Sequence, residues 1–541
     1  MKYGFVIDNR KCIGCHACTT ACKSEHDVPI GVNRTWVKQV EKGEFPNTRR
    51  LFSVMRCNHC TDAPCVEICP VEALFFRDDG IVDFDKDRCI GCKSCMQACP
   101  YDALYIDPET HTAAKCNYCA HRIDIGLEPA CVNVCPEHAI ISGDMENPDS
   151  EITQLLSRQQ VKVRKPEKGT IPNLFYIDAD EASLNPTATE KPDDYFWNSQ
   201  SLGVGHFAKE AEKMAFSNPD VVSAIMEASG NTAQAGQLAE SGPQRSVDVL
   251  TKGLGGKAKL TYNSPDKGIL WGWEVSTYVW TKAISAGAFL VPFMAGLFGL
   301  QQSSDITWWS YGLAMVFLIL TGLFLVMDLD QPKRFVYVLL RPQWKSWLVK
   351  GGYAITAYGG LISLLALCAF MNWQIPLLNW VTAGVAGLVA VYTAFLFAQA
   401  KGRDFWQSPT LAIHMLVHSI MAGAASFLLL GLFLESLASW MPFLQNVLLA
   451  TIGVNMLTML MELTMTHPTN DAKKVVHMIT SGRYRNLFFA GVVLLGNLIP
   501  AALMFGFNVP LYASISGLLV LIGIFFTEKI WVEAPQRIPL S

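Results

Sequence analysis

The sequence predicts a chain in two parts: a cysteine-rich α+β domain, followed by an all-α bundle of eight membrane-spanning helices. Sixteen of the 17 cysteines lie between Cys12 and Cys135, whereas the long apolar runs all follow about residue 270. Hydrophobic residues make up 51% of the 541 residues and charged residues only 17%, against roughly 25% charged in soluble domains. This composition and a net charge of −4 exclude a disordered, collagen-like or nucleic-acid-binding chain.

The amino-terminal run MKYGFVIDNRKC has no apolar stretch after its lysine, so we do not expect an ordinary signal peptide. The internal pair Arg49–Arg50 leads into LFSVMRC, which is too short and too polar for an export signal. Without export, cysteines in such number favour metal ligation over disulfide bonds.

The cysteines of the first domain form four groups of four. The first and third groups have the spacing C-x2-C-x2-C-x3-C, whereas the middle gap holds four residues in the second group and eleven in the fourth. In chain order the groups are Cys12, Cys15, Cys18 and Cys22; Cys57, Cys60, Cys65 and Cys69; Cys89, Cys92, Cys95 and Cys99; and Cys116, Cys119, Cys131 and Cys135.

This spacing has a physical reason. A cubane iron–sulfur cluster needs four converging thiolates; a tight loop supplies three, and the fourth cysteine of the group points at a neighbouring cluster. Two groups therefore hold two clusters, and four groups predict four 4Fe–4S clusters in two double-cluster, ferredoxin-like modules. Zinc uses C-x2-C pairs but has no use for a third cysteine in the loop. Zinc or disulfides are the alternatives. His16, His59 and His121 lie in or beside these loops, but every group is complete, so we expect them to hydrogen-bond a sulfur or the backbone.

The motifs KCIGCHACTTACK, CNHCTDAPCVEICP, CIGCKSCMQACP and CNYCAHRIDIGLEPACVNVCP, with the later KPEKGTIPNLFYI, resemble a known family. Residues 1–187 look like the four-cluster electron-transfer subunit of membrane molybdenum oxidoreductases, such as dimethyl sulfoxide and polysulfide reductases. The resemblance implies crossed ligand sets. These are Cys12, Cys15, Cys18 and Cys135; Cys116, Cys119, Cys131 and Cys22; Cys57, Cys60, Cys65 and Cys99; and Cys89, Cys92, Cys95 and Cys69.

Residues 188–268 are polar and rich in Ala, Gly and Ser, and they contain no motif. We expect a tether between the two domains, with short helices around Phe207–Met214 and Pro219–Ala228. A partner-binding surface is the alternative.

Residues 269–541 contain eight runs close to the roughly 20 apolar residues that a helix needs to cross a bilayer. The predicted spans are about 275–300, 308–327, 353–370, 377–399, 411–432, 443–465, 487–505 and 510–526.

The Lys and Arg residues after residue 268 predict the orientation of these spans. Apart from Lys282, which is inside the first span, all thirteen lie in loops on one side or in the carboxyl-terminal tail. The positive-inside rule makes that side cytoplasmic. The cluster domain enters from the same side, so we expect an inner-membrane, multi-pass protein with its cluster domain in the cytoplasm. An exported assembly is the alternative.

The runs VWTKAISAGAFLVPF, MDLDQPKRF and FWQSPTLAIHML resemble the polysulfide-reductase-type membrane subunit, the NrfD family, over about residues 270–541. The resemblance implies a haem-free, eight-helix anchor that exchanges electrons with a membrane quinone, menaquinone or ubiquinone. In that family the cluster and membrane subunits are usually separate chains, whereas here they are fused.

Ionisable residues inside a membrane are costly, and they are functional candidates for that reason. With the predicted orientation, all those of this chain fall in the cytoplasmic half: Glu274, Lys282, Asp328, Asp330, His414, His418 and Glu462. A quinone that takes two electrons also needs two protons, so we expect these residues, Asp330 excepted, to form the quinone site and its proton supply.

Other interpretations of these residues stay open. The two histidines could merely bond neighbouring helices, and Asp330 could anchor a helix end with Lys333 and Arg334. We expect no haem, because no other span contains an opposing histidine. The outer half has only neutral groups such as Asn455 and Asn497, so proton pumping across the membrane is not expected.

The sequence therefore predicts an electron-transfer and membrane-anchor subunit rather than a substrate-converting one. Electrons would pass through four 4Fe–4S clusters between a large cytoplasmic catalytic subunit, of the molybdopterin type, and the membrane quinone pool. The alternative is an energy-coupling or wiring subunit of a non-molybdenum complex, of the thiol–disulfide type, without quinone chemistry of its own.

Overall fold

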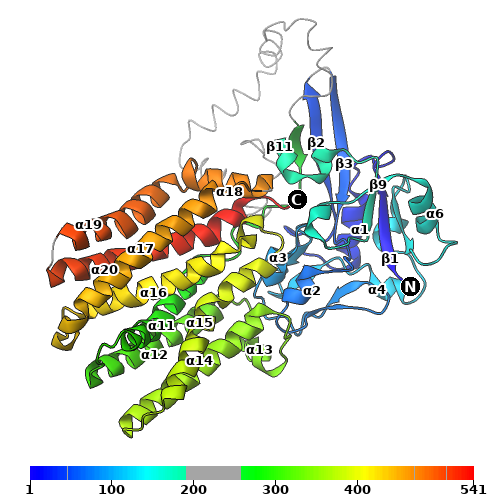
Figure 1. The fold of residues 1–541 in the computed structure, drawn as a ribbon. Coiled ribbons are helices and arrows are strands. Elements are labelled where there is room, and N and C mark those ends of the chain that lie inside the picture. Colours follow the sequence, from blue (N-terminus) through cyan, green and yellow to red (C-terminus); the bar gives the residue numbers. More distant parts are fainter. Residues whose placement is uncertain (45–46, 191–257, 468, 507–508) are drawn as a thin grey trace, which may run out of the picture.

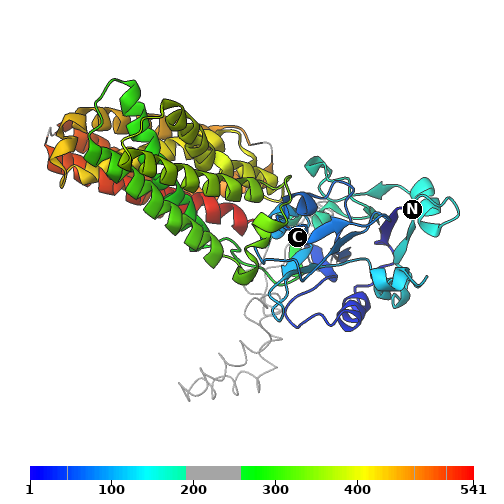
Figure 2. The same ribbon diagram turned by 90° about the horizontal axis from the view of Figure 1, so that it is seen from below.

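The computed structural model describes residues 1–44, 47–190, 258–467, 469–506 and 509–541. The two short helices predicted between residues 207 and 228 lie outside the described residues. The cluster domain lies at one end of a long helical bundle (Figure 1). The same arrangement is seen after a quarter turn (Figure 2).

The cluster domain is built on a four-stranded sheet of order β8-β1-β10-β9. Its inner strand β1 (Tyr3–Asp8) pairs in parallel with β10 (Leu174–Ile177) and antiparallel with β8 (Ile140–Asp144), while β9 (Val161–Lys162) forms an edge. Strand β1 reads YGFVID and is almost entirely buried, as expected of a strand covered on both faces.

Short elements surround this sheet and carry the cysteines. A helix begins within each cysteine group, and two small hairpins separate the groups. The helices are α1 (Ala17–Glu25), α2 (Pro64–Ile68), α3 (Ser94–Ala98), α4 (Ala120–Ile123) and α5 (Ala130–Asn133); α6 (Glu151–Arg158) and α7 (Glu181–Leu184) follow. The hairpins are β4 (Leu74–Phe76) with β5 (Val82–Phe84), and β6 (Leu104–Ile106) with β7 (Ala113–Lys115).

A second sheet, of order β11-β12-β2-β3, joins distant parts of the chain. The long hairpin of β2 (Trp36–Glu44) and β3 (Asn47–Met55) projects from the domain (Figure 1). Strands β11 (Thr189–Glu190) and β12 (Ala258–Tyr262) extend the sheet from β2. The two ends of the predicted tether are therefore strands of the cluster domain.

The membrane part confirms the predicted eight-helix bundle. Its spans are α11 (Trp273–Leu297), α12 (Ser304–Met327), α14 (Trp347–Phe370), α15 (Pro376–Gln399), α16 (Thr410–Leu430), α17 (Met441–Thr464), the π-helical η7 (Leu487–Leu498) continued by α19 (Ile499–Gly506), and α20 (Pro510–Glu533). Helices α11 and α16 are the most buried. They cross where Gly287 faces Gly423, and a Cβ atom on either glycine would overlap the backbone of the other helix.

The third cysteine loop rests directly on the bundle. The amides of Asp330 and Gln331, just beyond α12, donate to the carbonyls of Gly91 (3.4 Å) and Ile90 (3.2 Å). The indole of Trp271 donates to the carbonyl of Cys92 at 3.1 Å. Backbone groups thus fix the loop against the membrane part.

The carboxyl-terminal tail lies between the helical bundle and the cluster domain. After α20 it passes through η8 (Ala534–Arg537), and Gln536 hydrogen-bonds Gln97 of the cluster domain at 2.6 Å. Arg164 donates to the carbonyl of Leu540 at 3.1 Å, and the Ser541 hydroxyl to Asp102 at 3.0 Å. The tail therefore ties the bundle to the cluster domain.

Candidate functional site: the cysteine groups and the pocket at the membrane

The structure brings the cysteines together in crossed sets. Cys12 lies near Cys15 and Cys135, and Cys22 lies near Cys116, Cys119 and Cys131. We number the four sets by position: site 1 is Cys12, Cys15, Cys18 and Cys135; site 2 is Cys22, Cys116, Cys119 and Cys131; site 3 is Cys57, Cys60, Cys65 and Cys99; site 4 is Cys69, Cys89, Cys92 and Cys95. The grouping is the one that the resemblance implies.

The surroundings of the sulfur atoms suit iron–sulfur clusters. Peptide N–H groups donate to cysteine sulfurs: those of Gly91 and Ala113 to Cys89 (3.4 and 3.3 Å), and that of Ala139 to Cys135 (3.2 Å). Such bonds stabilise thiolates and tune cluster potentials. Gly91 needs its positive φ of 70° and its missing side chain, because a Cβ atom would press on Asp330. A thiolate donor set of this kind fits 4Fe–4S clusters.

The histidines near the loops have protein partners, but only His59 bonds the backbone as predicted, whereas His16 and His121 contact side chains. His16 contacts the Gln39 amide (2.9 Å), His59 accepts from the Val82 amide (3.2 Å), and His121 contacts Glu25 (2.7 Å). A further histidine was missed: His26 Nε2 lies 3.2 Å from Cys119 Sγ in site 2. The two residues are 93 positions apart, and no local pattern indicates the contact.

The four sites form a row across the cluster domain. Cys18 of site 1 lies near Cys131 of site 2, Cys116 of site 2 near Cys57 of site 3, and Cys65 of site 3 near Cys95 of site 4. Cys15 is exposed, so site 1 reaches the protein surface, whereas site 4 lies against the helical bundle. The row therefore runs from an exposed end to the membrane.

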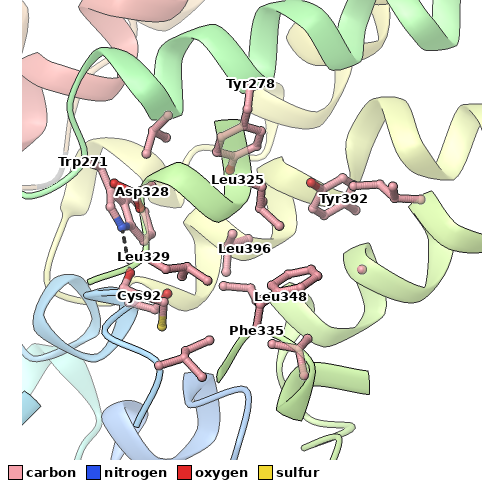
Figure 3. Close-up of a pocket in the computed structure, with 16 residues that line it drawn as sticks. Cys92, Trp271, Tyr278, Leu325, Asp328, Leu329, Phe335, Leu348, Tyr392 and Leu396 are labelled. Atoms are coloured by element: carbon pink, nitrogen blue, oxygen red, sulfur yellow. Dashed lines mark hydrogen bonds between the residues drawn. The ribbon is translucent and has the colours of Figure 1, made fainter. Parts of the chain in front are cut away.

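A pocket lies where site 4 meets the bundle (Figure 3). Ile90, Cys92 and Ser94 of the third cysteine loop form one wall. The opposite walls are apolar side chains of four spans together with three polar ones, Tyr278, Asp328 and Tyr392. This lining, mostly apolar with a few convergent polar groups, resembles that of small-molecule sites. The cavity itself measures about 30 Å³, room for about one water, so a larger molecule would have to part its walls.

Asp328 is the pocket's acidic group, and it stands just beyond the end of α12. Lys93 Nζ donates to its backbone carbonyl (2.8 Å) and lies 3.7 Å from its carboxylate. Burial raises the pKa of Asp328 to about 7, and the negative charges of Glu274 and Asp330 add to this, while Lys93 opposes it. The carboxyl group can therefore hold or release a proton near neutral pH.

Two other predicted residues lie near the pocket. Glu274 is close enough to Asp328 for its negative charge to raise the pKa of that carboxyl group. Lys282 lies behind the pocket, against residues of α15. Lys282 Nζ donates to the Thr393 hydroxyl (2.6 Å) and lies 4.8 Å from the ring centre of Tyr392, which lines the pocket. These residues form one group around the pocket.

His414, His418 and Glu462 form a second, deeper group that does not line the pocket. His414 Nδ1 lies 3.3 Å from Glu462, and His418 Nδ1 lies 2.7 Å from Glu528. His418 Nε2 also contacts Asn455 at 3.1 Å. All these side chains are buried, so the group is a closed polar network inside the bundle.

Glu528 was not among the predicted site residues. The eighth span was predicted to end at residue 526, but α20 continues to Glu533 and buries Glu528 to 2% exposure. A helical continuation of the apolar run through Ile530, Trp531 and Val532 would have indicated it, since those residues are also buried. Asn455 was predicted in the outer half, yet it bonds to His418 of the network.

The family models match both parts of the chain. Residues 262–533 match the model "Polysulphide reductase, NrfD", and residues 11–74 and 48–145 match two models of a 4Fe-4S dicluster domain. The NrfD match spans half of the chain.

Three curated relatives resemble the cluster domain. The B subunit of tetrathionate reductase from Salmonella typhimurium is 47% identical over 189 residues, 34% of this chain and 76% of the relative. The polysulfide reductase B chain of Wolinella succinogenes is 42% identical over 181 residues (32% and 94%), and protein NrfC of Escherichia coli is 43% identical over 181 residues (33% and 81%). The chain therefore belongs to the NrfD family, and it joins a 4Fe–4S dicluster ferredoxin-type subunit of the polysulfide and tetrathionate reductase kind to an integral NrfD membrane anchor.

Proposed function

We propose that this chain carries electrons between a catalytic partner docked at site 1 and a membrane quinone bound in the pocket beside site 4. Four 4Fe–4S clusters, one in each site, would transfer the electrons. The observation that carries the proposal is the position of Cys92, which is a ligand of site 4 and also part of the pocket wall. A molecule in the pocket would lie beside the last cluster.

The exposed end of the row suits a partner. Cys15 and the neighbouring Ile13 are exposed, and Ile13 leaves 56% of its surface open. The relatives are named as subunits of tetrathionate and polysulfide reductases. We therefore infer a large catalytic subunit of the molybdopterin oxidoreductase type as the partner at site 1.

The protons of quinone chemistry would come from the residues around and behind the pocket. Asp328 touches the pocket and exchanges a proton with a bound quinone oxygen. The negative charge of Glu274 favours the protonated form of Asp328, and the charge of Lys282 lies over the Tyr392 ring of the pocket wall. The network of His414, His418 and Glu462 stores protons deeper in the bundle. Proton supply therefore lies on the side of the membrane where the clusters lie.

We infer that the cluster domain faces the cytoplasm from the inner membrane. The loops next to it carry the lysines and arginines, which the positive-inside rule places in the cytoplasm. The opposite loops carry none. The polar residues of the pocket lie at the same end of the bundle.

Quinone-dependent oxidation of the clusters tests the proposal without the partner. Dithionite should bleach the iron–sulfur absorbance of the purified chain. After excess dithionite is removed, a water-soluble menaquinone analogue mixed in should oxidise the clusters and restore the absorbance. Gly352 lines the pocket, whereas a side chain at Gly360 of the same helix would meet nothing within 4 Å. Gly352→Phe should therefore slow oxidation at least tenfold, and Gly360→Phe should not. Equal rates in the two variants would refute the pocket as the quinone site.

A further inference from the structure

Two cations are buried among the cysteine sites, Arg56 after β3 and Lys115 at the end of β7. Both have 0% exposed surface. Within the described part of the chain, neither forms a salt bridge with a carboxylate. Burying an unpaired cation costs several kcal/mol, so each must face another source of negative charge.

Arg56 faces site 2. Its Nη1 atom donates to Cys131 Sγ at 3.0 Å, and its guanidinium lies 4.5 Å from the ring centre of Phe5. Its Nε and Nη2 atoms find no hydrogen-bond partner among the residues that the structure describes. Phe5 and the strand behind it hold the guanidinium in place, so its charge is directed at the sulfurs.

Lys115 faces site 3. Its ammonium donates to the carbonyls of Cys116 (2.9 Å) and Val82, which fix its position in the gap between sites 2 and 3. From there its charge acts on Cys57 and Cys65 of site 3. His59 lies within reach of both cations, and its Nδ1 accepts a hydrogen bond from the Val82 amide.

The two end sites are arranged differently. Site 1 is open to the surface at Cys15. At site 4, Lys93 is shared with Asp328 and Asp330, and the half-buried Arg334 donates to the carbonyl of Cys89 at 3.0 Å. In the described part of the chain, Arg56 and Lys115 differ from these cations in being fully buried with no carboxylate partner.

A fixed positive charge next to an iron–sulfur cluster stabilises its reduced, more negative form and so raises its reduction potential. A hydrogen bond to a ligand sulfur acts in the same direction. We propose that Arg56 raises the reduction potential of the cluster in site 2 and that Lys115 raises that of the cluster in site 3. The inference rests on the proposed four-cluster assignment.

Redox titration of the purified chain, followed by electron paramagnetic resonance with chemical mediators, tests this. Arg56→Gln should lower the midpoint potential of one cluster most, with a smaller shift in a second cluster because Cys18 of site 1 is also within reach of Arg56. Lys115→Gln should lower the midpoint potential of a different cluster most. Arg56→Lys, which keeps the charge, should shift its cluster less than Arg56→Gln. Arg158→Gln, at an exposed position on α6, is the control and should change nothing.

Unchanged potentials in Arg56→Gln and Lys115→Gln, with full iron content, would overturn the inference. If Arg56→Gln fails to assemble, Lys115→Gln decides the question alone. The titration uses neither quinone nor partner, so it is independent of the proposed electron route. A wild-type iron content below that of four clusters would instead contradict the cluster assignment itself.

Discussion

Asp328 is the residue on which the proposed chemistry of the pocket depends most directly. It combines a position in the pocket wall with a pKa near neutrality, which burial brings about. A general acid or base of this kind typically contributes a factor of about 10² or more to a rate. We expect Asp328→Asn to slow quinone-dependent cluster oxidation about 10²-fold in stopped-flow measurements.

Asp305, exposed in the first turn of α12 at the opposite end of that helix, supplies the control. Asp305→Asn should oxidise its clusters at the wild-type rate. Equal rates for Asp328→Asn and the wild type would remove Asp328 from the chemistry.

Lys38 gives a prediction about stability and pH. It is fully buried on β2, and its pKa falls to about 7 because burial and the nearby Arg164 and Lys165 disfavour its charge. Between pH 7 and the ordinary pKa of 10.5, the unfolded chain holds a proton that the folded chain has released. Stability should therefore rise with pH across this window.

Lys38→Met should remove that rise and stabilise the protein at pH 7 by about 1–3 kcal/mol. Thermal unfolding in detergent at several pH values measures both effects. Lys42→Met is the matched control, because Lys42 lies on the same strand but pairs with Asp180 at 2.9 Å. Lys42→Met should keep the pH dependence of the wild type. If Lys38→Met kept it too, the prediction would be contradicted.

Sequence reasoning found the four cysteine groups because three of them are local, with three cysteines within a few positions; their crossed sets came from the family resemblance. It could not find Arg56 or His26, whose partners lie far along the chain. It also placed His414 and His418 in the quinone site and its proton supply; the structure puts them in a network that does not line the pocket, which leaves the proton supply as their proposed role. The depth of a residue in the membrane can be counted along its helix from the sequence. The sequence does not tell which neighbour that side of the helix faces.

At the scale of elements, the carboxyl-terminal tail joins the two domains through few contacts. Removing residues 539–541 deletes the carbonyl that accepts from Arg164 and the hydroxyl that bonds Asp102. The buried Arg164 would lose a partner, which is costly. We expect faster hydrogen–deuterium exchange in the Cys89–Cys99 loop of the truncated protein.

Ser541→Ala, which loses only one hydroxyl, should exchange at nearly the wild-type rate. If the truncated protein also exchanged like the wild type, the tail would not be what holds the domains together. Cluster content, measured in parallel, separates loosened docking from loss of the clusters.

The eight spans could be predicted because hydropathy alone defines them, but their ends could not. Helix α14 begins at Trp347 rather than near 353, and α20 runs seven residues past 526. Both extensions contain polar residues, so their mean hydropathy is too low to mark them as membrane-spanning. Tertiary contacts stabilise them as helix: Trp347 stacks on Phe395, and the Trp531 indole donates to Glu462. The pairing of β11 with β12 and of β12 with β2 could not be predicted either, since sheet partners distant in sequence leave no local pattern.

Protease accessibility measures the sidedness of the whole molecule. The cluster domain and the basic loops should be reached by trypsin in inverted membrane vesicles and protected in right-side-out spheroplasts. Cleavage at the exposed Arg49 and Arg50 would be detected by mass spectrometry of the released fragments. Cleavage in spheroplasts alone would place the clusters outside the cell and reverse the inferred orientation.

The fusion of the two parts has a consequence for assembly. In a complex of separate chains, the cluster subunit can dissociate from its anchor, and the two must be synthesised in balanced amounts. Here the covalent link keeps the local concentration of each part around the other high. The carboxyl-terminal tail, which lies at the junction, adds contacts between α20 of the bundle and the cluster domain. Uneven expression of the two parts is therefore impossible in this chain, and the junction between them survives dilution of the membrane.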